Sequence, residues 1–247
     1  MNSDVVVSFF DYSGNAVREW AELGYEAMCF DLAHKVKTYE PVGSAGGGIW
    51  YVPADLSPDG TGWDIARRMV GIKRTPAMVF GFPPCTDLAV SGAKHFATKW
   101  TADPTFQVRA VAMARQVEDM AKMWGSPYVI ENPRSVLSTL WRKPDHKFDP
   151  CDFGGYLPAD DAHPTWPDYI APRDAYTKDT WLWAGGGFVM PNTIRVEPEV
   201  LERVTKSGRT IRGSRQFMKL GGSSFKTKTI RNETPRGFAR AVLIANI

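Results

Sequence analysis

The chain has 247 residues, of which 43% are hydrophobic and 23% are charged, as in ordinary soluble globular domains with a sizeable core. No apolar run reaches the roughly 18 residues needed to span a bilayer, and Met1 to Asp4 do not begin a signal peptide, so we expect a cytoplasmic protein with no membrane partner. The three cysteines, Cys29, Cys85 and Cys151, are odd in number and irregular in spacing, which argues against a disulfide-stabilised fold.

The first part of the chain predicts a βαβ unit. Residues 5–10 form an apolar, β-branched and aromatic run typical of a strand, and the turn residues of Asp11–Asn15 break it. Residues 16–24 have apolar side chains near helical spacing, and residues 25–30 predict a second strand that closes at Asp31. This order indicates parallel strands joined by a right-handed crossover.

Similar strand and loop units follow. After a glycine-rich segment at 41–48, which we expect to be a loop, the predicted elements are a strand at 49–52 ending near Asp55, a helix at 62–70, a strand at 76–82, a long amphipathic helix at 104–124 and a strand at 128–130. Polar residues cluster where each strand ends, and ligands bind at that carboxyl edge in open α/β sheets. The predicted fold class is therefore α/β, with an open, mostly parallel sheet and helices on both faces.

The rest of the chain is less regular and more basic. Residues 141–176 lack periodicity, 180–183 predict a late strand, and 236–247 predict a helix or a strand. From Arg195 to the C-terminus there are 12 Lys and Arg against 4 Asp and Glu, a balance of +8, whereas the remaining 18 basic and 23 acidic residues give −5. We predict one domain over 1–247, in which 141–176 and 195–233 are small insertions that recognise a substrate, with a polyanion favoured over a merely solvated basic surface.

Three acidic positions at strand ends suggest a nucleoside cofactor. The turn Asp11–Asn15 lies between a strand and a helix, where backbone amides come close to a cofactor. Asp31 follows about twenty residues later and could accept hydrogen bonds from ribose hydroxyls, and Asp55 could accept one from an adenine amine. Each acid alone is more often a turn former, but three in succession favour a cofactor.

Cys85 and Glu131 are the sharpest chemical feature of the sequence. Cys85 follows Gly81-Phe-Pro-Pro84 at the end of one strand, and Glu131 ends the next strand. A buried structural cysteine is the commoner fate of a single thiol, but a cysteine and a glutamate at adjacent strand ends would share one cleft.

The order of these motifs resembles the cytosine carbon-5 DNA methyltransferases. That family has a cofactor turn near its N-terminus, a Pro-Cys loop after strand four and a Glu-Asn dipeptide after strand five, here Asp11–Asn15, Pro84-Cys85 and Glu131-Asn132. Small phage-type relatives, which carry Pro-Pro-Cys, Glu-Asn-Pro and a later Tyr-Thr-Lys segment, are also similar. The resemblance covers residues 5–133, and the chain lacks the large target-recognition domain of the family.

The resemblance implies a Rossmann-like, S-adenosylmethionine-dependent methyltransferase acting on carbon 5 of cytosine in DNA, in a bacterial or phage-infected cell. It implies that Cys85, Glu131 and Asn132 are catalytic. The expected cofactor-binding residues are Asp11, Tyr12, Ser13, Gly14, Asn15, Asp31, Leu32, Asp55, Leu56 and Pro83. The expected substrate-binding residues are Pro84, Thr86 and Lys178, together with Arg209, Arg212 and Arg215 of the basic segment.

In that family's chemistry a thiolate adds to carbon 6 of cytosine, while a glutamate hydrogen-bonds ring nitrogen 3. Two alternatives stay open: the same chemistry on a free cytosine nucleotide, because the recognition segments are small, and a nucleic-acid-binding relative without catalysis. We expect no metal, since His146, Cys151 and His163 have no regularly spaced fourth ligand.

Overall fold

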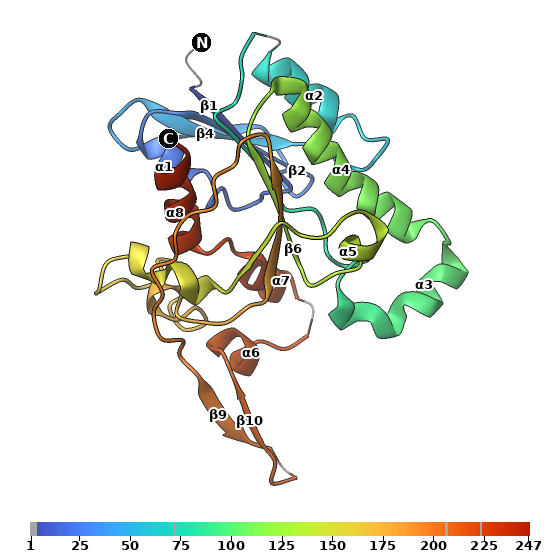
Figure 1. Cartoon of the computed structure of the whole chain (residues 1–247), viewed down its shortest axis with the longest axis vertical. Helices are drawn as coiled ribbons and strands as arrows, with labels where there is room; N and C mark the ends of the chain where they lie inside the picture. Colours follow the sequence, from blue (N-terminus) through green and yellow to red (C-terminus); the bar gives the residue numbers. More distant parts are fainter. Residues whose placement is uncertain (1–3, 72, 206, 223) are drawn as a thin grey trace. The chain divides into compact units, whose positions relative to one another are not determined.

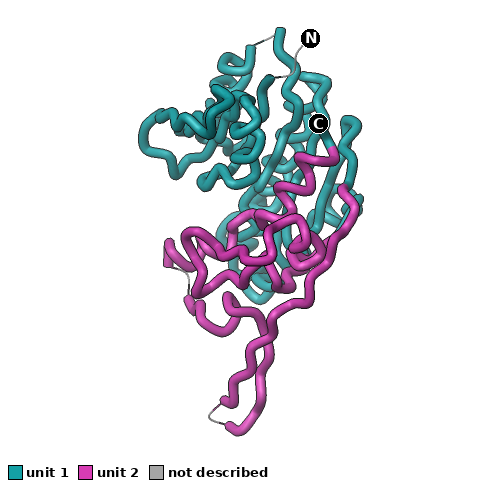
Figure 2. Tube along the Cα trace, turned by 90° about the vertical axis from the view of Figure 1, so that its left-hand side faces the viewer, with its two compact units in different colours: residues 1–147, 180–190, 246–247 teal, residues 148–179, 191–245 magenta. Residues whose placement is uncertain are grey.

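The computed structural model describes residues 4–71, 73–205, 207–222 and 224–247. Their contacts divide the chain into two compact units. Unit 1 contains residues 1–147, 180–190 and 246–247, and unit 2 contains 148–179 and 191–245 (Figure 2). The sequence indicated a single domain with two small insertions, and most of both predicted insertions falls within unit 2.

An eight-stranded, mostly parallel sheet dominates the fold (Figure 1). Its strands along the chain are β1 (Val5–Phe9), β2 (Glu26–Asp31), β3 (Thr38–Val42), β4 (Gly47–Pro53), β5 (Met78–Gly81), β6 (Tyr128–Pro133), β7 (His146–Phe148) and β8 (Thr180–Gly185). In space their order is β3-β4-β2-β1-β5-β6-β8-β7. Strands β4, β2, β1, β5 and β6 run parallel, whereas β3 and β8 pair antiparallel to β4 and β6. This is the predicted open α/β sheet of the Rossmann-like type.

Helices cover both faces of this sheet. α2 (Gly62–Val70) and α4 (Phe106–Trp124) lie on one face, and α1 (Arg18–Glu22) lies on the other (Figure 1). The buried side of α4 packs with alternate residues of β1 in the main hydrophobic core. The central strand β1 is buried at all five positions, which explains its uninterrupted apolar sequence. Unit 1 also contains the 3₁₀-helix η1 (Val90–His95) and the short helices α3 (Phe96–Ala102) and α5 (Leu137–Leu140).

Only residues 43–46 of the predicted loop at 41–48 form a turn, and the residues on either side belong to strands. Residues 38–42 form the edge strand β3, and β4 already begins at Gly47. Close packing explains two of the glycines: a Cβ on Gly47 would lie 2.1 Å from the carbonyl oxygen of Ala21, and one on Gly48 would lie 2.4 Å from the hydroxyl of Tyr39. These glycines therefore permit strand packing rather than chain mobility.

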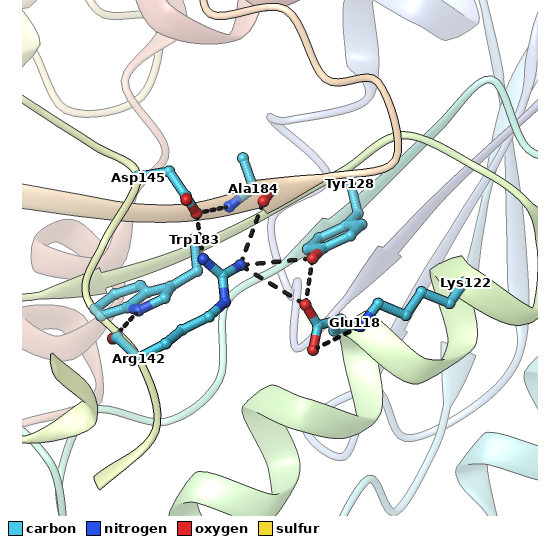
Figure 3. Close-up of polar contacts among 7 residues, drawn as sticks. All are labelled: Glu118, Lys122, Tyr128, Arg142, Asp145, Trp183 and Ala184. Atoms are coloured by element: carbon cyan, nitrogen blue, oxygen red, sulfur yellow. Dashed lines mark hydrogen bonds and ion pairs between the residues drawn. The ribbon is translucent and has the colours of Figure 1, made fainter. Parts of the chain in front are cut away.

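A polar network holds the antiparallel strand β8 against β6 and α4 (Figure 3). The guanidinium of Arg142 donates to the carbonyl oxygen of Ala184 at 3.3 Å and to the Tyr128 hydroxyl at 3.5 Å, and it pairs with Glu118 at 3.7 Å. The carboxylate of Asp145 also contacts Arg142 and accepts from the amide of Ala184 at 2.8 Å. The network fixes the strand that lies beside Glu131.

Unit 2 has its own small core and few regular elements. An aromatic cluster joins Phe148, Phe153 and Phe238, with ring centroids 4.3 Å apart for Phe148 and Phe238. Its elements are η2 (Pro150–Tyr156), η3 (Pro172–Asp174), the separate two-stranded sheet of β9 (Leu201–Val204) and β10 (Thr210–Gly213), and the helices α6 (Arg215–Lys219), α7 (Phe225–Asn232) and α8 (Arg236–Asn246). The sequence left helix or strand open for the last segment, and the structure makes it a helix. None of the helices within the described residues is long and apolar enough to cross a bilayer.

Candidate active site

Five parallel strands bring most of the predicted site residues to one edge of the sheet. The strands β4, β2, β1, β5 and β6 point the same way, so their carboxyl ends lie side by side. The segments that follow these ends contain Asp55, Asp31, Asp11–Asn15, Cys85 and Glu131. Residues far apart in the sequence therefore lie along one edge, where open α/β sheets bind ligands.

The turn after β1 is held together by the carboxylate of Asp11. Asp11 is only 4% exposed and accepts hydrogen bonds from the Ser8 hydroxyl at 2.8 Å, the Ser13 hydroxyl at 3.1 Å and the Gly14 amide at 2.7 Å. Phe10 adopts the left-handed conformation with φ of 58°, which turns the chain sharply out of the strand. Asp11 thus shapes the predicted cofactor turn from within.

Gly14 meets two backbone requirements in this turn. Its φ is +72°, and a Cβ at this position would lie 2.8 Å from the hydroxyl of Tyr51. A larger residue would be strained in conformation and would also displace the tyrosine. This single glycine therefore allows the turn to pack against Tyr51.

An aromatic cluster that the sequence analysis missed lies beside the turn. The rings of Tyr12 and His34 stack with centroids 5.3 Å apart, and the His34 ring meets Tyr51 edge-on at 5.3 Å. Nε2 of His34 lies 3.2 Å from the carbonyl oxygen of Asp11. Tyr51 in turn donates to Glu40 at 2.9 Å, and Arg18 binds the same carboxylate through two nitrogens. No spacing pattern connects these positions, because they come together only when β2, β3 and β4 pair.

Asp31 and Asp55 differ in their surroundings. Burial raises the pKa of Asp31 above its ordinary value, although its Oδ1 accepts from the Ala33 amide at 2.7 Å. Asp55 is exposed, and the Ser57 amide, which donates to Oδ1 at 2.9 Å, lowers its pKa. Among their neighbours, Leu32 is 73% exposed and could contact a ligand. Leu56, also predicted to bind the cofactor, is only 3% exposed and packs in the main core.

Cys85 lies in a tight turn beyond β5. Its side chain is half-buried, whereas Pro83 is buried and Pro84 is exposed. Its carbonyl oxygen accepts from the amides of Leu88 at 3.0 Å and Ala89 at 2.8 Å, which closes the turn after the thiol. The thiol is thus placed on a rigid turn at the sheet edge.

Asn132 joins this turn to the end of β6. Its side chain is 1% exposed, and its Nδ2 donates to the carbonyl oxygen of Pro83 at 2.9 Å. Glu131, the preceding residue, is half-buried at the same strand end and lies opposite Leu182 of β8. The Glu131-Asn132 dipeptide is therefore linked by a buried hydrogen bond to the residue that precedes Pro84-Cys85.

The chain segments beyond Cys85 and Glu131 also pair with each other. The Val90 amide donates to the Arg134 carbonyl at 3.1 Å, and the Val136 amide donates to the Leu88 carbonyl at 2.9 Å. Lys99 of α3 adds a further tie, because its Nζ donates to the Thr86 carbonyl at 3.0 Å and pairs with Asp87. The sequence analysis assigned no role to Lys99.

The predicted substrate-binding cations belong to unit 2 and differ from one another. Arg209 is exposed, whereas Arg212 pairs with Glu202 at 2.7 Å. Arg215 contacts both carboxylate oxygens of Glu199 at 2.6 Å and donates to the Pro167 carbonyl at 2.7 Å. Lys178 is half-buried, and its backbone amide donates a hydrogen bond to the Asp149 carboxylate at 2.7 Å. Arg215 therefore ties two segments of unit 2 together, and its predicted substrate contact stays a prediction.

The described part of the chain contains no cluster of three or more His, Cys, Asp and Glu side chains arranged to hold a metal ion. Instead, the Nδ1 of His163 accepts from the amides of Thr165 and Trp166 at 3.3 and 3.0 Å. Cys151 is fully buried, and the ring of His146 packs near Phe188. Each of these three residues has a local structural environment of its own.

Comparison with known proteins gives a distant structural likeness. No protein-family model and no curated protein matches the chain. A solved E. coli structure, described as that of a candidate DNA modification methyltransferase encoded within a prophage, is similar with a TM-score of 0.41 and 13% sequence identity. The match covers 73% of this chain and 46% of that protein, so the chain aligns with less than half of its length.

Proposed function

We propose that the chain is an S-adenosylmethionine-dependent methyltransferase that acts on carbon 5 of cytosine in DNA through a covalent bond to Cys85. The hydrogen bond from Asn132 to Pro83 is the observation that carries this proposal. It couples the cysteine turn to the strand end that bears Glu131, at the same sheet edge as the glycine turn after β1. A nucleophile, an acid and a cofactor turn at one edge are the parts that this chemistry requires.

Cys85 is the best nucleophile among the three cysteines. Cys29 and Cys151 are completely buried, and burial raises the pKa of both thiols above the ordinary value. For Cys29 the nearby carboxylate of Asp11 adds to this effect. Since the thiolate is the reactive form, these two thiols are poorly suited to attack a base, and the half-buried Cys85 is the accessible one.

The reaction on cytosine divides naturally between Cys85 and Glu131. Sγ of Cys85 forms a bond to carbon 6, and Glu131 delivers a proton to ring nitrogen 3, so that carbon 5 becomes nucleophilic like an enamine. Carbon 5 then takes the methyl group. Loss of the carbon-5 proton to a base then restores the ring double bond as the bond between Sγ and carbon 6 breaks, which frees the Cys85 thiolate, and ring nitrogen 3 returns its proton to Glu131. In duplex DNA the target base must first leave the helix.

The residues at the first two strand ends fit the cofactor. When bound, S-adenosylmethionine supplies an electrophilic methyl group on a positively charged sulfur. Asp31 can accept from ribose hydroxyls through Oδ2, which makes no hydrogen bond among the described residues. Exposed Leu32 offers an apolar surface next to it, and the turn around Gly14 lies at the same edge of the sheet.

Covalent trapping tests this proposal. A DNA duplex that contains 5-fluorocytosine cannot release its carbon-5 substituent as a proton, so the protein should remain attached after methyl transfer and gain the mass of the duplex strand. Cys85→Ser should abolish the adduct, while Cys29→Ala and Cys151→Ala, at the two buried thiols, should keep it. Glu131→Gln should slow adduct formation by about 100- to 10,000-fold, the usual value of general acid catalysis.

The products separate the alternatives. Nucleoside mass analysis should find 5-methylcytosine in the reacted DNA. A methyl group on the exocyclic amine would contradict the covalent mechanism, as would full activity of Cys85→Ser. Trapping with 5-fluoro-dCMP, but not with the duplex, would assign the same chemistry to a free nucleotide.

A further inference from the structure

The strands β9 and β10 form a two-stranded antiparallel ribbon that pairs with no other strand of the described chain. Figure 2 shows the two strands as a narrow extension of unit 2. Most of their side chains are exposed, including Val204 at 66%. Because isolated two-stranded ribbons are marginally stable in water, this one depends on its anchor at the base and is free to bind along its length.

The base of the ribbon is well anchored within unit 2. Arg215, directly after the ribbon, binds Glu199 through two hydrogen bonds, and Glu199 precedes β9. The Ser214 hydroxyl caps α6 by accepting from the Phe217 amide at 3.3 Å, and Gly213 packs against the Phe217 ring. These contacts hold both strands where they leave the body of unit 2, so the ribbon is presented in a defined orientation relative to α6.

The two faces of the ribbon carry different charges. Glu202 and Arg212 lie opposite each other and form an ion pair at 2.7 Å, which neutralises one face. Arg203 lies opposite Ile211 on the other face. Arg209, one residue before β10, is two residues from Ile211, and because side chains alternate along a strand it lies on the same face. Among the described residues, neither the Arg203 nor the Arg209 guanidinium forms a hydrogen bond or an ion pair. This second face, Arg203, Arg209 and Ile211, is the cationic face.

All the charged residues from Arg203 to Asn232 are basic. From Arg203 to Asn232 the chain has nine Lys and Arg residues and no Asp or Glu. Lys219, Lys226, Lys228 and Arg231, on or beside the helices that follow the ribbon, are all exposed. A stretch of this composition complements a polyanion.

We propose that the cationic face of the ribbon inserts into the major groove of duplex DNA, while the exposed cations of α6 and α7 contact phosphates. This inference rests on the proposed function and names its substrate as duplex DNA, in place of a free nucleotide. The major groove of B-form DNA is wide enough for a two-stranded ribbon, whereas the deep and narrow major groove of A-form RNA is not. Arginine at such a position can form two hydrogen bonds with guanine, and Ile211 can contact a thymine methyl group.

Fluorescence anisotropy with the full-length chain and a labelled DNA duplex, over a series of salt concentrations and without cofactor, tests the inference. Arg203→Ala combined with Arg209→Ala should weaken binding roughly ten- to hundredfold and flatten the salt dependence by up to about two charges. The matched control is Glu202→Gln combined with Arg212→Gln, which removes the ion pair on the opposite face without changing the net charge. The control should bind DNA as the unmodified protein does.

Equal losses in both double variants, or no loss in the first, would overturn the assignment of the cationic face. Binding to an RNA duplex of the same sequence as tightly as to DNA would overturn insertion into the major groove. Because the assay needs neither cofactor nor chemistry, its outcome is independent of covalent trapping. Ribbon-dependent DNA binding without any Cys85 adduct would leave this inference standing and refute the proposed reaction.

Discussion

The side-chain amide of Asn132 donates a buried hydrogen bond of 2.9 Å to the main-chain carbonyl of Pro83, two residues before Cys85. The donor belongs to β6 and the acceptor to the turn after β5, so this contact ties the cysteine turn to the neighbouring strand end. Asn132 therefore acts through the cysteine turn as a positioning residue.

Asn132→Ala should loosen the turn. It leaves the buried Pro83 carbonyl without this donor, which should lower the free energy of unfolding by about 1–3 kcal/mol. The same change should increase the rate at which iodoacetamide alkylates Cys85 under native conditions, because the thiol is held less firmly. Urea unfolding and mass-monitored alkylation give the two readouts. A variant that loses stability but alkylates at the original rate would assign Asn132 a purely structural role.

Asp31→Ala should weaken binding of S-adenosylmethionine by roughly 1.5–3 kcal/mol, the range for hydrogen bonds to a charged group. Isothermal titration calorimetry gives the affinity directly. Asp59→Ala is the control, since Asp59 is an exposed acid in the loop before α2 and has no expected contact with the cofactor. Equal losses for both variants would mean that only the overall charge matters.

Asp11→Asn should damage the turn after β1 despite its similar size. One carboxylate oxygen accepts from the Ser8 hydroxyl and the Cys29 thiol, and the other accepts from the Ser13 hydroxyl and the Gly14 amide. An amide nitrogen in place of either oxygen would face two donors instead of accepting from them. We expect a fall in unfolding free energy of about 1–3 kcal/mol, together with weaker cofactor binding. Ser13→Ala removes only one of these donors and should have a smaller effect in the same two assays.

His163 and Asp174 should give unit 2 two opposing pH dependences. Burial lowers the pKa of His163 to about 4, so its contribution to stability is present above its ordinary value of 6.5 and is lost as the pH falls toward 4. Burial raises the pKa of Asp174 to about 6, so its contribution is present below its ordinary value of 3.8 and is lost as the pH rises toward 6. The two effects largely offset each other between pH 4 and 6.

Replacing one of these two residues should reveal the pH dependence of stability that the other one causes. Asp174→Asn can still accept from the Gly237 amide, and this variant should lose on the order of 3 kcal/mol between pH 7 and pH 4 through His163. His163→Asn keeps an acceptor for the amides of Thr165 and Trp166. The double variant Asp174→Asn with His163→Asn should therefore no longer lose stability between pH 7 and pH 4. Urea denaturation midpoints at pH 7, 5 and 4 measure the loss of stability in both variants. An acid response of Asp174→Asn equal to that of the unmodified protein would contradict the assignment.

The central strands could be predicted because their burial leaves a simple pattern. β1, β2, β5 and β6 each contain a short apolar run, because both faces of a central parallel strand are covered. These runs end before Asp11, Asp31, Pro83 and Glu131. The helix α2 matches the predicted 62–70, and the predicted strand 180–183 lies within β8. The shared edge of Cys85 and Glu131 then follows from parallel topology.

The features that the sequence did not predict depend on pairing partners. β3 is a largely exposed edge strand that contains a proline, and charged residues interrupt the apolar positions of β9 and β10. Arg212 and Arg215 looked equivalent to Arg209 until the ribbon register and the chain path placed Glu202 and Glu199 beside them. The exposure of a charged residue depends on such partners, and spacing along the chain does not reveal them.

The antiparallel strand β8 also matters while the chain is being synthesised. It is the neighbour of β6 on the side away from β5, yet it begins at Thr180, long after β6 ends at Pro133. During that interval the ribosome synthesises the whole first segment of unit 2, while β6 presents an unpaired row of backbone donors and acceptors. The strand that bears Glu131 is therefore open to pairing with another nascent chain, and slow translation between these two strands should lower the yield of folded protein.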